Sequence, residues 1–366
     1  MTAADAVAAV LVLAVTVYAC SGLADYGAGF WDLTAGGRET GRRPRALIDT
    51  AVTPVWEVNH VWLIFLLILC WTAFGSAFAS IMSTLFIPLA LAALGIVLRA
   101  ASFAMRKDAA RAGTRHLAGW LFGVGSVLTP FCLGATLGAI LTGRVPPGNA
   151  AGNEWSSWLN ATSVAIGLLA VATGAFLAAV YLVAEARRRG APDLQNYFRV
   201  RARVAGAAGL VLGGAALVAL WADQPKMFDR LAGRSWWLLL LGLLALVATF
   251  LLAGRGRVRG LRLVAAIGVA ALVWAWAVAQ YPYLLPFSLT ISAGSGAAAT
   301  LRWVLIWFVV ALLVVGPALV LLYVLDQRGE VGEDPTTSRP SKIEQGSPAS
   351  SAQTGSLHPT GGRADE

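Results

Sequence analysis

The chain has 366 residues, 58% of them hydrophobic and 13% charged, whereas soluble proteins carry about 25% charged residues, so it lacks the polar surface to coat a water-soluble globule. Its net charge of +9 comes from arginines in short clusters between apolar blocks, without a basic patch interleaved with aromatic residues, which excludes a nucleic-acid-binding protein. The apolar blocks have the length, roughly 20 residues, that crosses about 30 Å of hydrocarbon as an α-helix. The sequence therefore predicts an all-α integral membrane protein.

Apolar segments follow one another along the chain, and nine of them are predicted to span the membrane: residues 5–24, 59–79, 81–104, 118–141, 159–184, 203–221, 235–252, 261–280 and 302–325. The first resembles a signal peptide, but Asp5 is the only charge before its apolar run, and a signal peptide begins with basic residues. We expect it to be retained. Residues 327–366 lack apolar periodicity, which predicts a disordered cytoplasmic tail after a transmembrane domain of residues 1–326.

The loops between these segments alternate in charge. Those after the first, third, fifth and seventh segments carry the Arg and Lys clusters of residues 38–45, 106–115, 187–203 and 255–262. The other loops are poor in positive charge, except residues 222–234, where Asp223 and Asp229 offset three basic residues. Because cytoplasmic loops carry the excess of Lys and Arg, we expect the N-terminus outside and the C-terminus in the cytoplasm.

Residues that could hold a redox metal are scarce. Of the histidines His60, His116 and His358, only His60 touches a predicted span, and none of the four methionines is placed to pair with it. A haem inside a helical bundle usually needs two such axial ligands. The three cysteines lie far apart within apolar segments, without metal-ligand or disulfide spacing. We therefore expect this chain alone to bind no haem and no metal.

Three ionisable residues lie at membrane depth on the predicted cytoplasmic side of the first three spans: Asp25, Glu57 and Arg99. Arg99 is about 10 Å inside the boundary at helical rise. An arginine so deep is costly unless a carboxylate neutralises it, so we expect a pair with Glu57 or Asp25. Such a group either locks three helices together or forms a hydrated path for protons from the cytoplasm, and the two interpretations are compatible.

Three neighbours of Glu57 complete this candidate proton path. Trp56 is expected to anchor the second span at the interface. Asn59 needs hydrogen-bond partners and is expected to tie that span to the preceding loop, and His60 is expected to be hydrogen-bonded near the interface.

Three motifs resemble subunit II of the cytochrome bd-type quinol oxidases in order and spacing. They are Asp-Tyr-Gly-Ala-Gly-Phe-Trp-Asp-Leu (25–33), Pro-Val-Trp-Glu-Val-Asn-His-Val-Trp-Leu (54–63), and the segment from Pro88 through Gly-Ile-Val-Leu-Arg-Ala-Ala-Ser-Phe (95–103). The Trp-Glu-x-Asn-His variant is similar to the bd-like or cyanide-insensitive branch. The motif resemblance covers residues 20–107, and the nine-span outline extends it to about residue 325.

This resemblance implies a heterodimer in the cytoplasmic membrane of a bacterium, surrounded by lipid. A haem-bearing subunit I would hold two haems b and a haem d, or a further haem b in its place, and would oxidise quinol near the outer face. Subunit II of the family is haem-free and contributes to a proton path from the cytoplasm to the oxygen-reducing haem. Glu57 is the acidic residue of that path, and Asp25 and Arg99 occupy matching family positions. The resemblance leaves open the quinone type and whether this chain binds a structural quinone.

The chain departs from the family pattern at three places. Gly75-Ser76 stands where relatives often have Phe-Pro, so we expect that turn to differ. Glu57 replaces the commoner Asp and moves the carboxylate by about one methylene group. Tyr26 replaces the commoner Phe, and we expect little consequence.

Two alternatives remain open from the sequence. A secondary transporter would use Asp25, Glu57 and Arg99 as a substrate or proton site, although such sites lie at discontinuous helices near the midplane, whereas these charges lie toward one face. A scaffold that stabilises its partner without moving protons is the other alternative.

Overall fold

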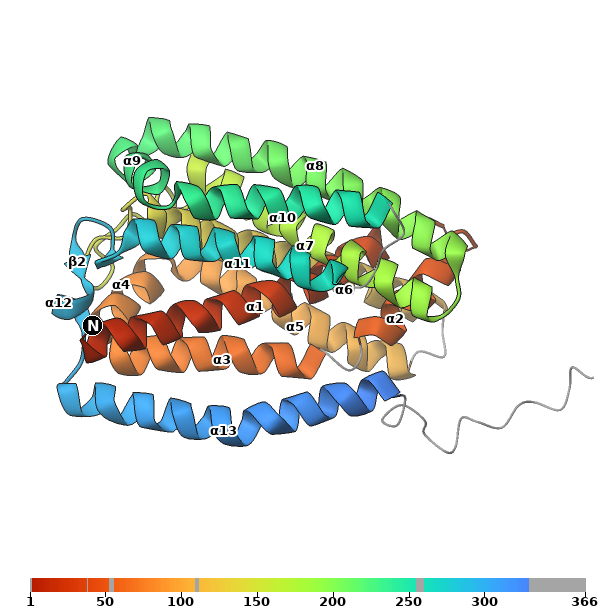
Figure 1. Ribbon diagram of the computed structural model, residues 1–366, viewed down its shortest axis with the longest axis horizontal. Helices are drawn as coiled ribbons and strands as arrows, with labels where there is room; N and C mark the ends of the chain where they lie inside the picture. Colours follow the sequence, from red (N-terminus) through yellow and green to blue (C-terminus); the bar gives the residue numbers. More distant parts are fainter. Residues whose placement is uncertain (1, 38, 53–55, 109–111, 255–259, 329–366) are drawn as a thin grey trace, which may run out of the picture. The chain divides into compact units, whose positions relative to one another are not determined.

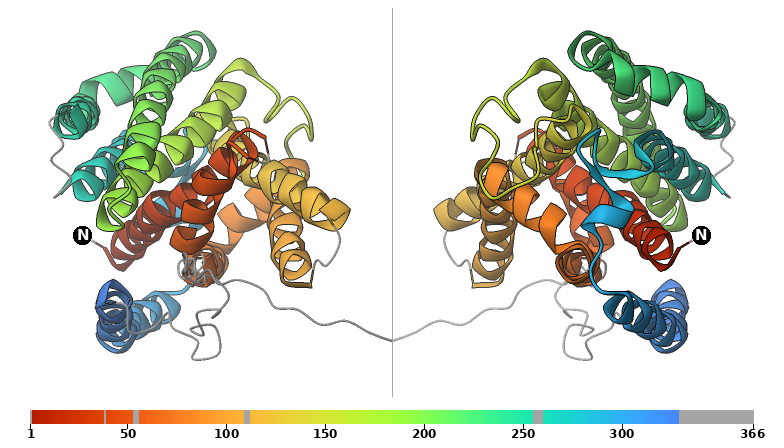
Figure 2. Two further views of the ribbon diagram at one scale, coloured as in Figure 1. Left: turned by 90° about the vertical axis from the view of Figure 1, so that its right-hand side faces the viewer. Right: turned by 90° about the vertical axis from the view of Figure 1, so that its left-hand side faces the viewer.

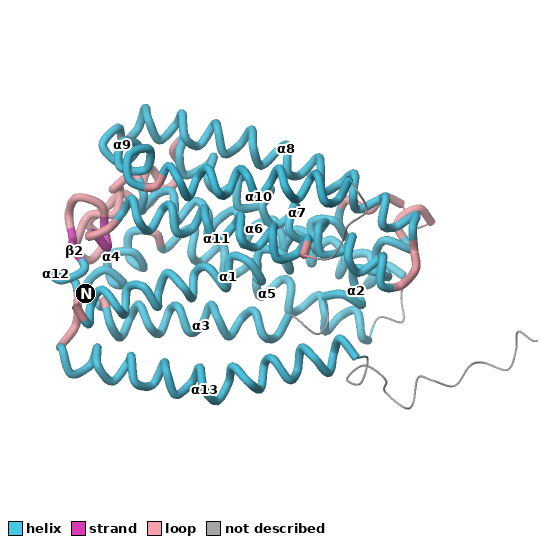
Figure 3. Tube along the Cα trace, viewed as in Figure 1, coloured by secondary structure: helices cyan, strands magenta, loops and turns pink. Residues whose placement is uncertain are grey.

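The computed structural model describes residues 2–37, 39–52, 56–108, 112–254 and 260–328. It divides into two units, residues 1–311 and 312–366. Nearly all of the described chain is helical (Figure 3). The long helices are α1 (Ala3–Leu33), α3 (Trp56–Ala73), α5 (Phe86–Asp108), α6 (Ala112–Leu141), α7 (Ala161–Arg188), α8 (Pro192–Asp223), α10 (Trp236–Gly254), α11 (Leu261–Gln280) and α13 (Ala298–Arg328).

Shorter elements connect the long helices. They are α2 (Arg42–Val52), α4 (Gly75–Thr84), α9 (Pro225–Arg234), α12 (Ile291–Gly294), and an antiparallel pair of strands, β1 (Tyr283–Leu285) and β2 (Leu289–Thr290). Within the described residues, eight helices are long and apolar enough to cross a membrane, or nine if the bent α3–α4 pair counts as one span. The prediction of an all-α membrane protein is confirmed.

The predicted span 59–79 is wrong beyond Ala73. Helix α3 ends there, and α4 leaves it at an angle of 120°. Phe74 at the corner has a non-helical backbone (φ −135°, ψ 51°) and is completely buried. The next predicted span, 81–104, is likewise displaced, because residues 81–84 belong to α4 and α5 begins at Phe86. Apolar residues continue through the corner, so hydropathy does not reveal it.

Helix α1 is in contact with several other long helices. It packs against α3, α6, α7 and α11, as the end-on views of Figure 2 show. It lies close to the backbone of α7, where a Cβ atom added to Gly27 would lie 1.9 Å from the carbonyl oxygen of Gly174. Only a residue without a side chain fits such a backbone contact.

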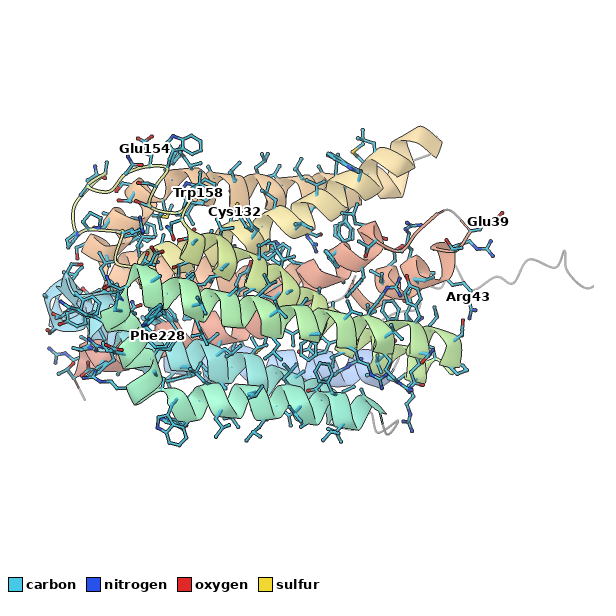
Figure 4. The ribbon with its side chains drawn as sticks, turned by 90° about the horizontal axis from the view of Figure 1, so that it is seen from above. Glu39, Arg43, Cys132, Glu154, Trp158 and Phe228 are labelled. Atoms are coloured by element: carbon cyan, nitrogen blue, oxygen red, sulfur yellow. The ribbon has the colours of Figure 1, made fainter. Side chains whose placement is uncertain are left out.

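The connections of the first unit gather at its two ends (Figure 1). The N-terminus, α4, α9, the strands and α12 lie at one end, called here the α4 end, and α2 lies at the other, the α2 end. Figure 4 shows Glu154 at the first end and Glu39 at the second. The segment before α7 is fixed to α4 by backbone N–H groups that donate to side-chain hydroxyls over 2.8–3.4 Å: Gly148 to Ser80, Ala150 to Ser83 and Gly152 to Thr84.

A long-range hydrogen bond closes the corner between α3 and α4. The backbone N–H of Gly296 donates to the carbonyl oxygen of Ala73 over 2.8 Å. Around this corner Phe74, Leu69 and Ala77 pack with the first turns of α1 and with Ile291 of α12. The corner is therefore built from segments far apart in the sequence.

The second unit contains the remainder of α13, from Leu312 to Arg328, with Pro317 inside the helix. The predicted cytoplasmic tail, residues 327–366, lies outside the described residues after Arg328.

Candidate functional site

A buried ion pair joins α1 and α5 in the first unit. Arg99 Nη2 donates to Asp25 Oδ1 over 2.7 Å, and the two side chains are 0% and 2% exposed. The expected pairing of Arg99 with a carboxylate is therefore confirmed, with Asp25 as the partner. Each ion loses its hydration in this environment. Removing one member would therefore leave the other as an uncompensated buried charge.

A third helix, α6, contributes to the surroundings of Arg99. Nη1 of Arg99 donates to the Ser126 hydroxyl, which in turn donates to the carbonyl oxygen of Phe122 over 2.6 Å. The guanidinium carbon lies 4.7 Å from the ring centre of Tyr26 and 4.5 Å from that of Phe122. Aromatic faces attract a desolvated cation. Arg99 thus holds α1, α5 and α6 together.

Two atoms of the ion pair are not used by the contacts above. Among the residues that the structure describes, Asp25 Oδ2 and Arg99 Nε have no hydrogen-bond partner. Leaving a buried polar atom unsatisfied costs about 1–3 kcal/mol, more for a charged group. The site therefore keeps a carboxylate oxygen that is able to accept a proton or a hydrogen bond.

A tyrosine pair extends the site along α1. The hydroxyls of Tyr18 and Tyr26 lie 3.2 Å apart, and both side chains are buried. The expectation that Tyr26 in place of Phe has little consequence overlooked this bond, which a phenylalanine cannot make. The sequence gives one indication that Tyr18 belongs to the site: Tyr18 and Asp25 are seven residues apart and so share a helix face.

Helix α3 reaches the site through its first turns. Asn59 is 2% exposed, and its Nδ2 donates to the Ser21 carbonyl oxygen of α1 over 3.4 Å. The sequence predicts that Asn59 bonds the preceding loop, whereas its described hydrogen bond is to α1. Because α1 and α3 run in opposite directions, the backbone of Glu57, about 3 Å before Asn59, lies level with residues 23–25 of α1.

The remaining predicted site residues are less fully described. The side chains of Trp56 and Glu57 lie outside the described residues. His60 is half-buried on the first turns of α3. The structure thus brings Asp25 and Arg99 into contact and places the turn of Glu57 at their level, whereas the predicted role of the six residues in proton transfer stays a prediction.

Another buried carboxylate shows how differently such a group can be surrounded. Glu185 of α7 is 5% exposed and is bound by three arginines: Arg188 at 2.5 Å, Arg189 at 2.9 Å and Arg262 at 3.5 Å. Both of its carboxylate oxygens have partners. Glu185 is therefore fully neutralised, in contrast to Asp25 with its single arginine.

Candidate ligands for a haem or a metal ion are scarce among the described residues. They contain no group of three or more His, Cys, Asp or Glu side chains that could hold a metal. His60 is the single histidine whose side chain is described. A haem with two protein ligands would need a second donor. Of the methionines with described side chains, Met82 lies on α4, Met227 on α9 and Met105 near the end of α5.

These features define the class of protein: a multi-span α-helical membrane protein with a buried ion pair at membrane depth. The family model for cytochrome bd terminal oxidase subunit II matches residues 3–326. One similar solved structure is a chain of the bd oxidase from Geobacillus thermodenitrificans, with a TM-score of 0.74 and 25% sequence identity, over 89% of this chain and 98% of that chain. No curated protein sequence matches the chain significantly.

The chain belongs to the cytochrome bd terminal oxidase subunit II family. The family resemblance drawn from the three motifs is thereby confirmed, and the chain is part of a bd-type oxidase. The transporter alternative is not favoured, because both the family model and the solved structure belong to oxidases.

Proposed function

We propose that this chain is the haem-free second subunit of a quinol oxidase in a bacterial cytoplasmic membrane, and that it conducts protons toward its partner. In this proposal subunit I holds haems b and a haem d, or a second haem b in its place, and takes electrons from quinol. The haems supply the electron transfer and the oxygen chemistry. The small number of histidines in the chain, three in all, supports the assignment of the haems to the partner.

The observation that carries the proton-conducting role is the pair of Asp25 and Arg99 beside the turn of Glu57. Reduction of oxygen to water consumes protons at a site inside the membrane, so a path of titratable groups must reach it. Ionisable residues inside a membrane are expensive and usually serve such a path. Arg99 is held on three helices and keeps Asp25 in place, and Asp25 retains an unused oxygen.

The direction of uptake follows from the loops. The Arg-rich connections that the structure describes, before α2 and between α7 and α8, lie toward the α2 end, which we assign to the cytoplasm by the excess of positive charge. Asp25, Glu57 and Arg99 then lie in the cytoplasmic half of their helices. If quinol releases its protons on the other side, the complex builds a proton gradient without a separate pump.

The experiment that tests this role is Glu57→Gln in the assembled complex. The amide keeps the shape of the side chain but does not titrate, so we expect the rate of oxygen reduction to fall about tenfold or more, with a deeper loss at alkaline pH where protons are scarce. The haem spectrum should remain that of the unmodified complex. The rate is measured by oxygen consumption with saturating quinol.

Glu39→Gln is the matched control, since Glu39 is an exposed carboxylate at the same α2 end. An unchanged rate and pH profile in Glu57→Gln would show that Glu57 does not relay protons. Failure of that variant to assemble with its haem-bearing partner would favour a purely structural role.

A further inference from the structure

One face of α1 carries a continuous buried stripe of polar and glycine residues. Tyr18, Gly22, Asp25, Gly29 and Asp32 follow each other at intervals of four and three residues, and all five are buried. Residues so spaced lie along one side of an α-helix. The stripe extends about 21 Å at 1.5 Å per residue. It begins within the membrane at Tyr18 and ends at Asp32, next to the α2 end.

The outer end of this stripe is a second buried carboxylate with a cation beside it. Asp32 is 3% exposed, and its Oδ1 lies 3.6 Å from Nε of Arg45 on α2. The same Nε donates to the Asp32 carbonyl oxygen over 3.3 Å, and Nη2 donates to that of Gly36 over 2.7 Å. Arg45 is 32% exposed. Asp32 therefore stands between a side chain that reaches solvent and the interior of the helices.

The stretch between the two carboxylates is occupied by polar groups of other helices. Gly29 lies one turn from Asp25 and just under one turn from Asp32. A Cβ atom added to Gly29 would lie 1.9 Å from Ser126 Oγ and 3.0 Å from Arg99 Nη1. The hydroxyl and the guanidinium thus fill the space that a side chain at position 29 would take, and the polar character of the stripe is not interrupted there.

The carboxylate of Asp25, at the inner part of the stripe, supplies an independent indication that the stripe carries protons. Among the described residues, Asp25 Oδ2 has no hydrogen-bond partner although its side chain is 2% exposed. A buried acceptor left unsatisfied is destabilising and calls for an explanation. An acceptor that receives protons in turnover provides one.

We propose that Asp32 is the outermost proton-relay residue of this chain and passes protons along the stripe to Asp25. A proton from the aqueous phase binds the Asp32 carboxylate and makes a neutral carboxylic acid. The acid then releases that proton past Gly29 and Ser126 to Oδ2 of Asp25, and the Asp32 carboxylate is restored. One proton moves and no electron is transferred. Arg45 acts as a positioning residue. The inference rests on the proposed function and names a residue that the proposed path lacks.

The cation described beside Asp32 is Arg45, which stabilises its carboxylate between transfers. Apart from Arg45, the guanidinium of Arg201 on α8 lies 5.6 Å from the ring centre of Trp31. Other titratable groups of helices packed against α1 are Arg99 on α5, Glu185 on α7 with Arg262 on α11, and Glu57, Arg115 and His116, whose side chains lie outside the described residues.

The test is Asp32→Asn in the complete complex, with oxygen consumption followed from mildly acidic to mildly alkaline pH. We expect a rate lower by roughly 10- to 100-fold at neutral pH, a further loss at alkaline pH, an unchanged KM for quinol, and recovery in Asp32→Glu. Asp193→Asn is the matched control, because Asp193 forms an exposed pair with Arg43 at the same end. Its rate should equal that of the unmodified complex.

An Asp32→Asn complex with the unmodified rate and pH profile would overturn the inference, and so would a loss by the same factor at every pH. Should this variant not assemble, Asp32→Ser, whose hydroxyl does not titrate, is measured by the same criteria. Glu57→Gln run in parallel separates the two proposals. If it slows turnover while Asp32→Asn does not, Asp32 is no relay and the proposed function stands; if neither slows turnover, both are wrong.

Discussion

At the scale of single residues, the cost of removing Arg99 from water is offset by several weaker contacts. Taking an ion out of water costs several kcal/mol even after relaxation, and a close carboxylate recovers part of this. The rings of Tyr26 and Phe122 each face the guanidinium, and such a contact contributes about 2 kcal/mol when the cation is desolvated. The hydroxyl of Ser126 satisfies one further N–H group. No single contact offsets the desolvation of Arg99, so the ion pair, the two rings and the hydroxyl are all needed.

Replacing Arg99 with Gln should therefore destabilise the complex strongly. The change leaves the Asp25 carboxylate buried without its partner, and we expect a loss of about 3–5 kcal/mol, seen as a lower thermal unfolding midpoint or a failure to retain haem. Arg43→Gln, which removes an exposed pair, should change the stability by about 1 kcal/mol or less.

The double variant Arg99→Gln, Asp25→Asn distinguishes pairing from simple packing. It leaves no uncompensated charge, so it should be less destabilised than Arg99→Gln alone. A double variant whose loss equals the sum of the two single losses would contradict the role given to the ion pair.

The ion pair could be predicted from the sequence, whereas most of its surroundings could not. An arginine inside an apolar segment is rare enough to demand a carboxylate, and Asp25 was one of two candidates. Ser126 and Phe122 carry no comparable signal, because hydroxyl and aromatic residues are common in membrane helices. Their role depends on the packing of α6 against α5, which a single sequence does not encode in any local pattern.

At the scale of elements, the contact of α1 with α7 depends on two glycines. Gly27→Ala would bring a methyl group to within 1.9 Å of the Gly174 carbonyl oxygen, so the helices must separate. We expect a destabilisation of about 1–3 kcal/mol, as for overpacked cores, measured by thermal unfolding of the purified complex. Because α1 carries Asp25, a reduced turnover should accompany it.

Gly209→Ala on α8 is the matched control. A Cβ atom there meets nothing within 4 Å, and alanine favours a helix over glycine by about 1 kcal/mol. Its stability should be equal or slightly higher. Equal effects of the two substitutions would show that the α1–α7 contact has no special role.

The long helices could be predicted because an apolar run of sufficient length leaves few alternatives in a membrane. The corner at Phe74 and the short helices α2 and α9 could not. The departure at Gly75-Ser76 predicts an altered turn there, but not the 120° angle at Phe74 between α3 and α4. Helices α2 and α9 have ten or eleven residues and are amphipathic, below the length that hydropathy detects.

At the scale of the whole molecule, the alternating loops give a topology that labelling can test. In a variant whose three native cysteines are replaced by serine, a cysteine at Glu154 should react with a membrane-impermeant maleimide on intact cells. A cysteine at Glu39 should react only after permeabilisation, because it lies at the opposite, α2 end. The reversed pattern would place the proton path on the wrong side for uptake from the cytoplasm.

The hydrogen bond from Gly296 to Ala73 has a consequence for biosynthesis. The chain is threaded into the membrane from its N-terminus, and more than two hundred residues separate these two partners. Until residue 296 leaves the ribosome, the last carbonyl group of α3 lacks the donor that completes the corner. The hydrogen bond that completes the corner between α3 and α4 can therefore form only late in the synthesis of the chain.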